Sequence, residues 1–139
     1  MRLIEDEIVP VAGCNEEMSE AIDRARSSIR DFLGAFENPK PNQTSFLIKA
    51  RFEDNGSSEH IWLADLDFST RPATGVVANE PDIRSLTYME RVPFLPDQVS
   101  DWMYMEDGKL VGGFTTRVLL RASSKRGGFM SLLKHSLKM

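Results

Sequence analysis

Few side chains in this sequence could carry out acid–base or nucleophilic chemistry, and the adjacent pair Glu59-His60 is the first of them. An imidazole beside a carboxylate can act as a general base. Residues 60–68 alternate apolar and polar side chains, however, which predicts a strand, and neighbours on a strand project to opposite faces. Glu59 would then be unable to orient His60. The pattern therefore favours a buried, hydrogen-bonded structural histidine.

A second group of residues could form a small ligand pocket. If residues 102–105 and 110–120 form a hairpin, one face carries two aromatic rings with a threonine and an arginine, namely Trp102, Tyr104, Val111, Thr115 and Arg117. Such a face could form a small polar-aromatic surface that binds a ligand, with Asp101 at the mouth of the hairpin as a functional carboxylate. It could equally form the rim of a small core, with the arginine stacked on the rings and Asp101 capping a turn.

Neither cysteine chemistry nor a metal centre is indicated. Cys14 lies next to the start of a predicted helix, a position that can lower the pKa of a thiol, but Glu16 and Glu17 oppose that effect. Two histidines, at positions 60 and 135, and one cysteine give no metal-ligand spacing. We expect no catalytic residue, no metal and no cofactor.

The element that precedes these residues is an amphipathic helix. Asn15 is a suitable N-cap and Gly34 a suitable C-terminal cap. Between them apolar residues recur at steps of three and four, at Met18, Ala21, Ile22, Ala25, Ile29, Phe32, Leu33 and Phe36. A stripe of this kind packs against a larger layer.

The remaining elements alternate with a period of two, as strands do. Pairing Ala50 with Trp62 across the turn at 54–58 would place Phe52 opposite His60 and gather the apolar residues on one side. Shorter runs at 73–78 and 92–95 predict further strands, and residues 82–90 fit a short helix or a loop. Asp107-Gly108 favours a type I′ turn that opposes Gly112 to Met103 and Gly113 to Trp102, leaving room for the indole or marking a bulge.

These elements predict one α+β domain at residues 1–121, with the N-terminal helix packed on a mainly antiparallel sheet of about five strands. Residues 122–139 form a basic tail, either flexible or helical. The charge divides unevenly: residues 1–107 hold 10 Lys+Arg against 21 Asp+Glu, a balance of −11, whereas residues 108–139 hold seven bases and no acid.

The tail is itself a candidate contact surface. Its bases could bind nucleic acid or an anionic membrane, and the residues concerned are Lys125, Arg126, Lys134 and Lys138. If the tail is helical, Phe129, Leu132, Leu133 and Leu137 form a short apolar face. The alternative is that the tail folds back on the acidic body or is loose.

Several locations and classes are disfavoured by composition. Glu5-Asp6-Glu7 places carboxylates where a signal peptide needs a basic and then an apolar stretch. No apolar run approaches the ~20 residues that cross a bilayer, and a single cysteine excludes an internal disulfide. We expect a cytoplasmic protein.

Four motifs occur in order along the chain: Glu59-His60-Ile61-Trp62, Asn79-Glu80-Pro81, Ser100-Asp101-Trp102-Met103-Tyr104 and Gly112-Gly113-Phe114-Thr115-Thr116-Arg117. Together they resemble the YegJ-like bacterial family, domain of unknown function 2314, from the first helix to Arg121. The resemblance implies a small bacterial α+β domain without an established reaction. Glu90-Arg91-Val92 departs from it, because a glycine-acidic pair is expected before that strand.

We therefore expect a non-enzymatic binding or regulatory module that acts through a protein partner, one form being an immunity- or antitoxin-like protein. The first alternative is a small enzyme or ligand-binding protein with a pocket around His60, Asp101, Tyr104, Thr115 and Arg117. The second is binding of an anionic surface through the tail. The candidate binding residues of the body are Glu59, His60, Trp62, Asn79, Asp101, Trp102, Tyr104, Thr115 and Arg117.

Overall fold

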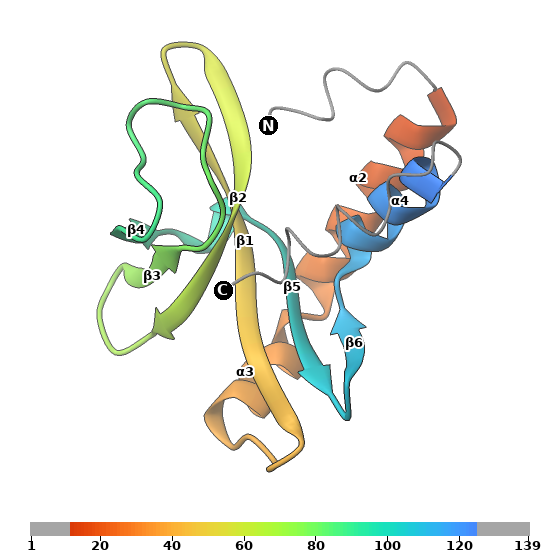
Figure 1. The fold of residues 1–139 in the computed structure, drawn as a ribbon, viewed down its shortest axis with the longest axis vertical. Coiled ribbons are helices and arrows are strands. Elements are labelled where there is room, and N and C mark those ends of the chain that lie inside the picture. The colour runs from red at the N-terminus through yellow and green to blue at the C-terminus, as the bar shows by residue number, and fades with distance from the viewer. Residues whose placement is uncertain (1–11, 125–139) are drawn as a thin grey trace.

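The computed structural model describes residues 12–124, which form three helices and one antiparallel sheet (Figure 1). The helices are α2 (Ala12–Ser27), α3 (Ile29–Glu37) and α4 (Phe114–Ser124), and a short 3-10 turn, η1, spans Pro96–Gln98. The strands are β1 (Gln43–Asp54), β2 (Ser57–Asp67), β3 (Ala73–Val77), β4 (Arg91–Phe94), β5 (Val99–Glu106) and β6 (Lys109–Gly112). They pair in the order β4-β3-β2-β1-β5-β6. The α+β class is confirmed, with six strands where about five were expected.

The N-terminal helix is interrupted at Ser28, whereas the sequence pattern predicted one helix to Gly34. The Ser28 hydroxyl donates to the Arg24 carbonyl oxygen at 2.6 Å, and α3 begins at the next residue. Serine side chains compete in this way for helical carbonyls and bend helices. Gly34 lies inside α3 and Asn15 inside α2, so neither residue is a cap.

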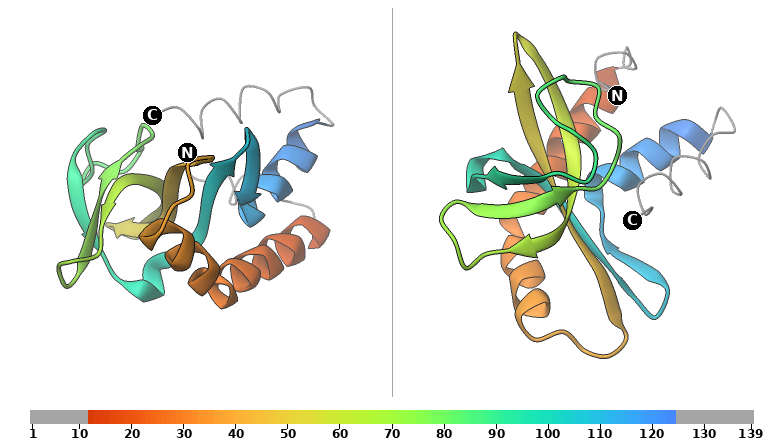
Figure 2. Two further views of the ribbon diagram at one scale, coloured as in Figure 1. Left: turned by 90° about the horizontal axis from the view of Figure 1, so that it is seen from below. Right: turned by 60° about the vertical axis from the view of Figure 1, so that its left-hand side comes forward.

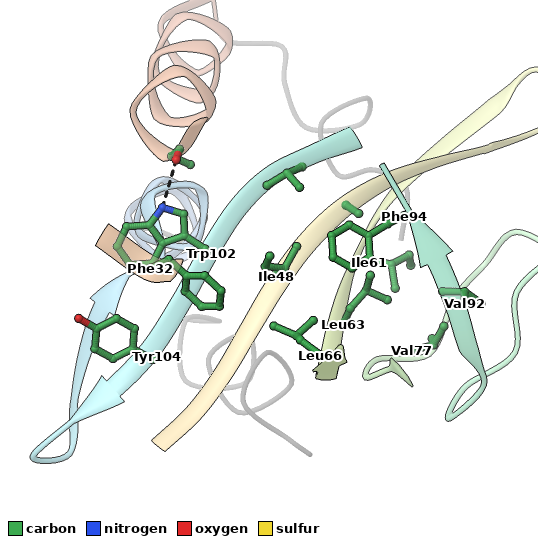
Figure 3. Close-up of a cluster of buried hydrophobic side chains, with 13 residues drawn as sticks. Phe32, Ile48, Ile61, Leu63, Leu66, Val77, Val92, Phe94, Trp102 and Tyr104 are labelled. Atoms are coloured by element: carbon green, nitrogen blue, oxygen red, sulfur yellow. Dashed lines mark hydrogen bonds between the residues drawn. The ribbon is translucent and has the colours of Figure 1, made fainter. Parts of the chain in front are cut away.

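Both of these helices cover one face of the sheet, which we call the first face (Figure 2). Ala25 and Phe32 are buried there against Ile48 and Trp102. The Trp102 indole nitrogen donates to the Ala25 carbonyl oxygen at 3.1 Å, which ties β5 to the end of α2 (Figure 3). The main core therefore lies between α2–α3 and the central strands.

The register of β1 and β2 differs from the predicted one by a single residue. Lys49, not Ala50, lies opposite Trp62, because the turn is a two-residue loop in which Asn55 and Gly56 both have positive φ. Trp62 therefore lies on the second face of the sheet, with Lys49 and Leu47, while Ile61 joins the first face. His60 is opposite Arg51 rather than Phe52.

The predicted register of the last hairpin is confirmed, since Met103 lies opposite Gly112. The strand, however, ends at Gly112, and residues 114–124 form α4 instead of extending the hairpin. Gly112 and Gly113 have φ of 78° and 62°, which turns the chain out of the sheet. A Cβ on Gly112 would lie 2.5 Å from the Trp102 ring, so this glycine does leave room for the indole.

The sheet ends on one side at β4, the edge strand expected near residues 92–95. Pro93 lies opposite Thr74 of β3. Residues 82–90, which precede this strand, form turns and bends and no helix.

Candidate functional site

Three polar side chains from distant parts of the sequence meet on the second face where α4 begins. Lys49 of β1, Asp101 of β5 and Thr115 of α4 are all buried. Lys49 Nζ donates to Thr115 Oγ1 at 2.9 Å, and Thr115 Oγ1 donates to Asp101 Oδ2 at 2.5 Å. We call these three residues the buried polar cluster.

Asp101 caps α4 from inside the sheet. Its Oδ1 accepts the backbone N–H groups of Trp102 at 2.8 Å and Phe114 at 3.1 Å, and its Oδ2 accepts that of Thr115 at 2.8 Å. A carboxylate at this position satisfies N–H groups that have no helical partner and faces the positive end of the helix dipole. Burial raises the pKa of Asp101, while the Lys49 charge and the Thr115 and Trp102 donors oppose that change.

Lys49 also contacts an aromatic ring on the neighbouring strand. Its Nζ lies 5.3 Å from the centre of the Trp62 ring, a cation–π distance that the observed register makes possible. The Trp62 backbone N–H in turn donates to Asn79 Oδ1 at 2.8 Å. Asn79 therefore fastens the chain after β3 to β2, which is a structural role for this candidate residue.

Glu59 and His60 project to opposite faces of β2, as the alternation predicted. The buried Glu59 carboxylate accepts the backbone N–H groups of Asp82 at 2.8 Å and Ile83 at 3.1 Å, so it holds the loop between β3 and β4. This loop and the β1–β2 turn border a cavity of about 210 Å³, lined by Asp54, Asn55, Ser57, Ser58, Glu59, Asp82, Ile83 and Arg84.

His60 is half-buried, and its Nδ1 shares a hydrogen bond of 2.9 Å with Ser100 Oγ. Burial lowers its pKa from 6.5 to about 4, and the positive charges of Lys49 and Arg51 add to that effect. The imidazole is therefore neutral near pH 7, which suits a structural hydrogen bond.

The lowered pKa of His60 makes stability depend on pH. Between pH 6.5 and about 4 the unfolded chain binds a proton at this position that the folded chain does not, so the stabilisation present above pH 6.5 is lost as the pH falls. We expect the wild type to lose about 2 kcal/mol more than His60→Gln between pH 7.5 and pH 5, measured by urea unfolding. Equal losses in the two proteins would contradict the assignment.

The residues of the predicted ligand pocket do not converge. Trp102 and Tyr104 lie in the core of the first face, whereas Asp101 and Thr115 lie in the buried polar cluster of the second. Arg117 is exposed on α4 and donates to the carbonyl oxygens of Gly112 and Leu110, which reinforces the chain reversal. The predicted shared face was wrong because residues 114–124 are helical.

Positive side chains of α4 face the acidic α2. Arg121 lies 3.8 Å from Glu17, and a cavity of about 180 Å³ between the helices is lined by Glu17, Glu20, Ala21, Arg24, Phe114, Arg117, Val118 and Arg121. At least one arginine of the basic C-terminal part, Arg121, therefore pairs with an acidic residue of the body. The tail candidates Lys125, Arg126, Lys134 and Lys138 lie outside the described residues.

Two features of the structure were not predicted from the sequence. A buried lysine in the apolar run Leu47-Ile48-Lys49-Ala50 is a signal that could have marked the polar cluster. Exposed apolar side chains at Phe68, Met89 and Leu95 gave no sequence signal, because single apolar residues in loops are common.

The described residues contain no candidate metal site and no membrane span. Within residues 12–124 no group of three or more His, Cys, Asp or Glu side chains could hold a metal ion. None of the helices in that range is long and apolar enough to cross a membrane.

These features define a small α+β domain whose central polar groups are closed off by internal hydrogen bonds, and the chain belongs to the bacterial family described as "Uncharacterized protein conserved in bacteria (DUF2314)", which matches residues 15–127. The uncharacterized protein YegJ of Escherichia coli (strain K12) is 32% identical over 118 residues, which cover 84% of this chain and 76% of that protein. The family resemblance is thereby confirmed.

A second relative is a longer protein. A Neisseria meningitidis serogroup B protein that carries an ankyrin-repeat name is 30% identical over 118 residues, which cover 78% of this chain but 47% of that protein. No solved structure matches the chain.

Proposed function

We propose that this protein is a non-enzymatic protein-binding module of the bacterial cytoplasm. The observation that carries the proposal is the placement of the large apolar side chains that residues 12–124 expose: Phe68 is 37%, Met89 63% and Leu95 51% exposed. We call these three residues the apolar edge, because they flank the outermost strands β3 and β4. Exposed apolar side chains along the edge of a sheet offer contact area to a protein partner.

The apolar edge is held in place by the fold. The Phe68 ring packs 6.1 Å from that of Phe94, the residue before Leu95, and the Met89 backbone N–H donates to the Val77 carbonyl oxygen at 2.9 Å. Leu95 and Met89 therefore project from fixed backbone at the two ends of β4. A preformed surface of this kind loses little conformational entropy when a partner binds.

The candidate polar residues are engaged in internal hydrogen bonds, which supports a binding function over a catalytic one. Asp101 and Thr115 are buried and hydrogen-bonded to one another, and Glu59 is occupied by two backbone N–H groups. A catalytic acid or base must reach a substrate, either directly or through one water molecule. The candidate acids of this chain serve instead to hold loops and a helix.

The relatives are consistent with a module that is used in different settings. The chain spans most of the Escherichia coli relative but less than half of the Neisseria relative. The name of the latter refers to ankyrin repeats, a solenoid type with extended binding surfaces. An immunity- or antitoxin-like role, with a toxin as the partner, is the specific form that we propose to test.

The test is capture of partners from the native host with tagged full-length protein. We expect Met89→Ser/Leu95→Ser to lose a specific partner that the wild type retains, because both side chains are exposed and their loss leaves the core intact. The matched control is Arg30→Ser/Glu37→Ser on the exposed side of α3, which should retain the partner.

Two results would overturn this proposal. One is the absence of any protein captured above background from the native host. The other is capture that is insensitive to Met89→Ser/Leu95→Ser but disappears at high salt and on neutralising Lys125, Arg126, Lys134 and Lys138, which would indicate anionic-surface binding through the tail.

A further inference from the structure

The second face of the sheet carries an apolar cluster without a second layer from the described residues. Its members are Leu47, Trp62, Ala64, Ala78 and Met103, with Leu110 packed beside them. All of them lie on strands or directly after one, and among residues 12–124 no helical residue belongs to the cluster. The first face, by contrast, is covered by α2 and α3.

These side chains are nevertheless buried. Leu47 is 0% and Met103 1% exposed, although Met103 and Leu47 are neighbours on paired strands of one sheet. Side chains on a sheet stand perpendicular to it, so one layer cannot remove its own long side chains from water. A stable domain covers such a face with a second layer.

We propose that residues 125–139 of this chain form that layer, by packing as an amphipathic helix across the second face. Apolar residues recur there at helical spacing, at Phe129, Leu132, Leu133 and Leu137. Fifteen helical residues extend about 22 Å, enough to cross four or five strands spaced about 4.8 Å apart. Gly127-Gly128 allows the chain to reverse after α4.

Charge favours the C-terminal segment over residues 1–11. Residues 12–124 hold 12 Lys+Arg against 18 Asp+Glu, a balance of −6, while residues 125–139 hold four bases and no acid. Residues 1–11 hold one base and three acids, so their balance of −2 has the same sign as the body. Opposite net charges raise the affinity of a tethered segment for the body, and like charges lower it.

The chain path allows this packing. The start of α4 is fixed on the second face, because Thr115 is hydrogen-bonded to Asp101 and Lys49 there. The helix α2, which follows residues 1–11, packs on the first face through Ala25. The last turn of α4, by contrast, lies beside α2, where Arg121 is 3.8 Å from Glu17, so residues 125–139 turn back at Gly127-Gly128 to reach the cluster.

The two tryptophans allow a test in the full-length protein, because Trp62 reports on the second face and Trp102 on the first. With 5-fluorotryptophan incorporated, ¹⁹F NMR resolves one signal for each. In Leu132→Ser/Leu133→Ser we expect the Trp62 signal to move and its H₂O/D₂O isotope shift to rise toward that of an exposed indole. The Trp102 signal should stay in place, and the control Ser131→Gln/His135→Gln, on the other side of the proposed helix, should change neither.

An unchanged Trp62 signal in Leu132→Ser/Leu133→Ser would overturn the proposal. So would a wild-type Trp62 signal that depends on protein concentration, because a second copy would then cover the face. If the leucine variant fails to fold, a second experiment tests the same proposal. A nitroxide label is attached to Ser131→Cys in a Cys14→Ser background, which leaves the apolar residues of the proposed helix in place. The label should broaden the Trp62 signal more than that of Trp102, and equal broadening would contradict the docking.

Discussion

Replacing Asp101 with alanine should lower the free energy of unfolding by about 3–5 kcal/mol. The substitution removes the acceptor of the Trp102 N–H in β5, of the Phe114 and Thr115 N–H groups in the first turn of α4, and of the Thr115 hydroxyl. It also leaves the buried Lys49 ammonium without the carboxylate that lowers its electrostatic cost. Urea unfolding at pH 7 measures the loss.

Matched variants separate the cap from the charge. Asp101→Asn keeps one acceptor oxygen and should be less destabilising than Asp101→Ala. Lys49→Met in the Asp101→Asn background removes the buried charge and should recover part of the loss, which a double-mutant cycle measures. A loss below about 1 kcal/mol for Asp101→Ala, the size of an average substitution, would contradict the central role of this carboxylate.

Gly112→Ala should be the second large effect, with a loss of about 2–5 kcal/mol in the free energy of unfolding. A Cβ there would lie 2.5 Å from both the Trp102 ring and its carbonyl oxygen, and φ is +78°. Overpacking costs about 1–3 kcal/mol, and left-handed backbone in a residue other than glycine costs roughly 1–2. The Trp102 ring is held in place, because its indole N–H donates a hydrogen bond to the Ala25 carbonyl oxygen of α2.

Gly108→Ala is the matched control for backbone strain. Its φ is +75°, close to that of Gly112, but nothing lies within 4 Å of its Cβ position. We expect it to lose only the backbone contribution of about 1–2 kcal/mol. Equal losses for the two variants in urea unfolding would show that the contact with the indole is unimportant.

The fold class could be predicted from local patterns, and its register only in part. The Asp107-Gly108 turn specifies the last hairpin register because a two-residue type I′ loop allows a single alignment. The first hairpin contains the same kind of signal in Asn55-Gly56, yet its predicted register was wrong. Both faces of β1 and β2 carry apolar side chains, so the alternation of apolar and polar residues could not distinguish the correct pairing from one shifted by a single residue.

The candidate site could not be assembled from the sequence because it depends on α4. Thr115, Thr116 and Val118 are β-branched and follow a hairpin turn, so residues 114–120 resemble a strand. The cap at the start of this helix comes from Asp101, thirteen residues before Phe114 along the chain, and is invisible to local patterns. An aspartate at the mouth of a hairpin often caps a turn, and this local signal correctly predicted a capping role for Asp101. It did not predict that the capped element is α4.

The edge strand β4 offers few free backbone groups with which a strand of another protein could pair. Val77 N–H donates to the Glu90 carbonyl oxygen, so that carbonyl and the backbone groups of 92 and 94 turn toward β3, and the backbone groups of 91 and 93 face outward. The outward position at 93 is a proline, which has no N–H to donate. Within β4 only Arg91 offers an outward donor, too little to template another strand. Neighbouring copies are thereby kept from joining their sheets along β4 into a larger aggregate, and a partner on this side must bind through side chains.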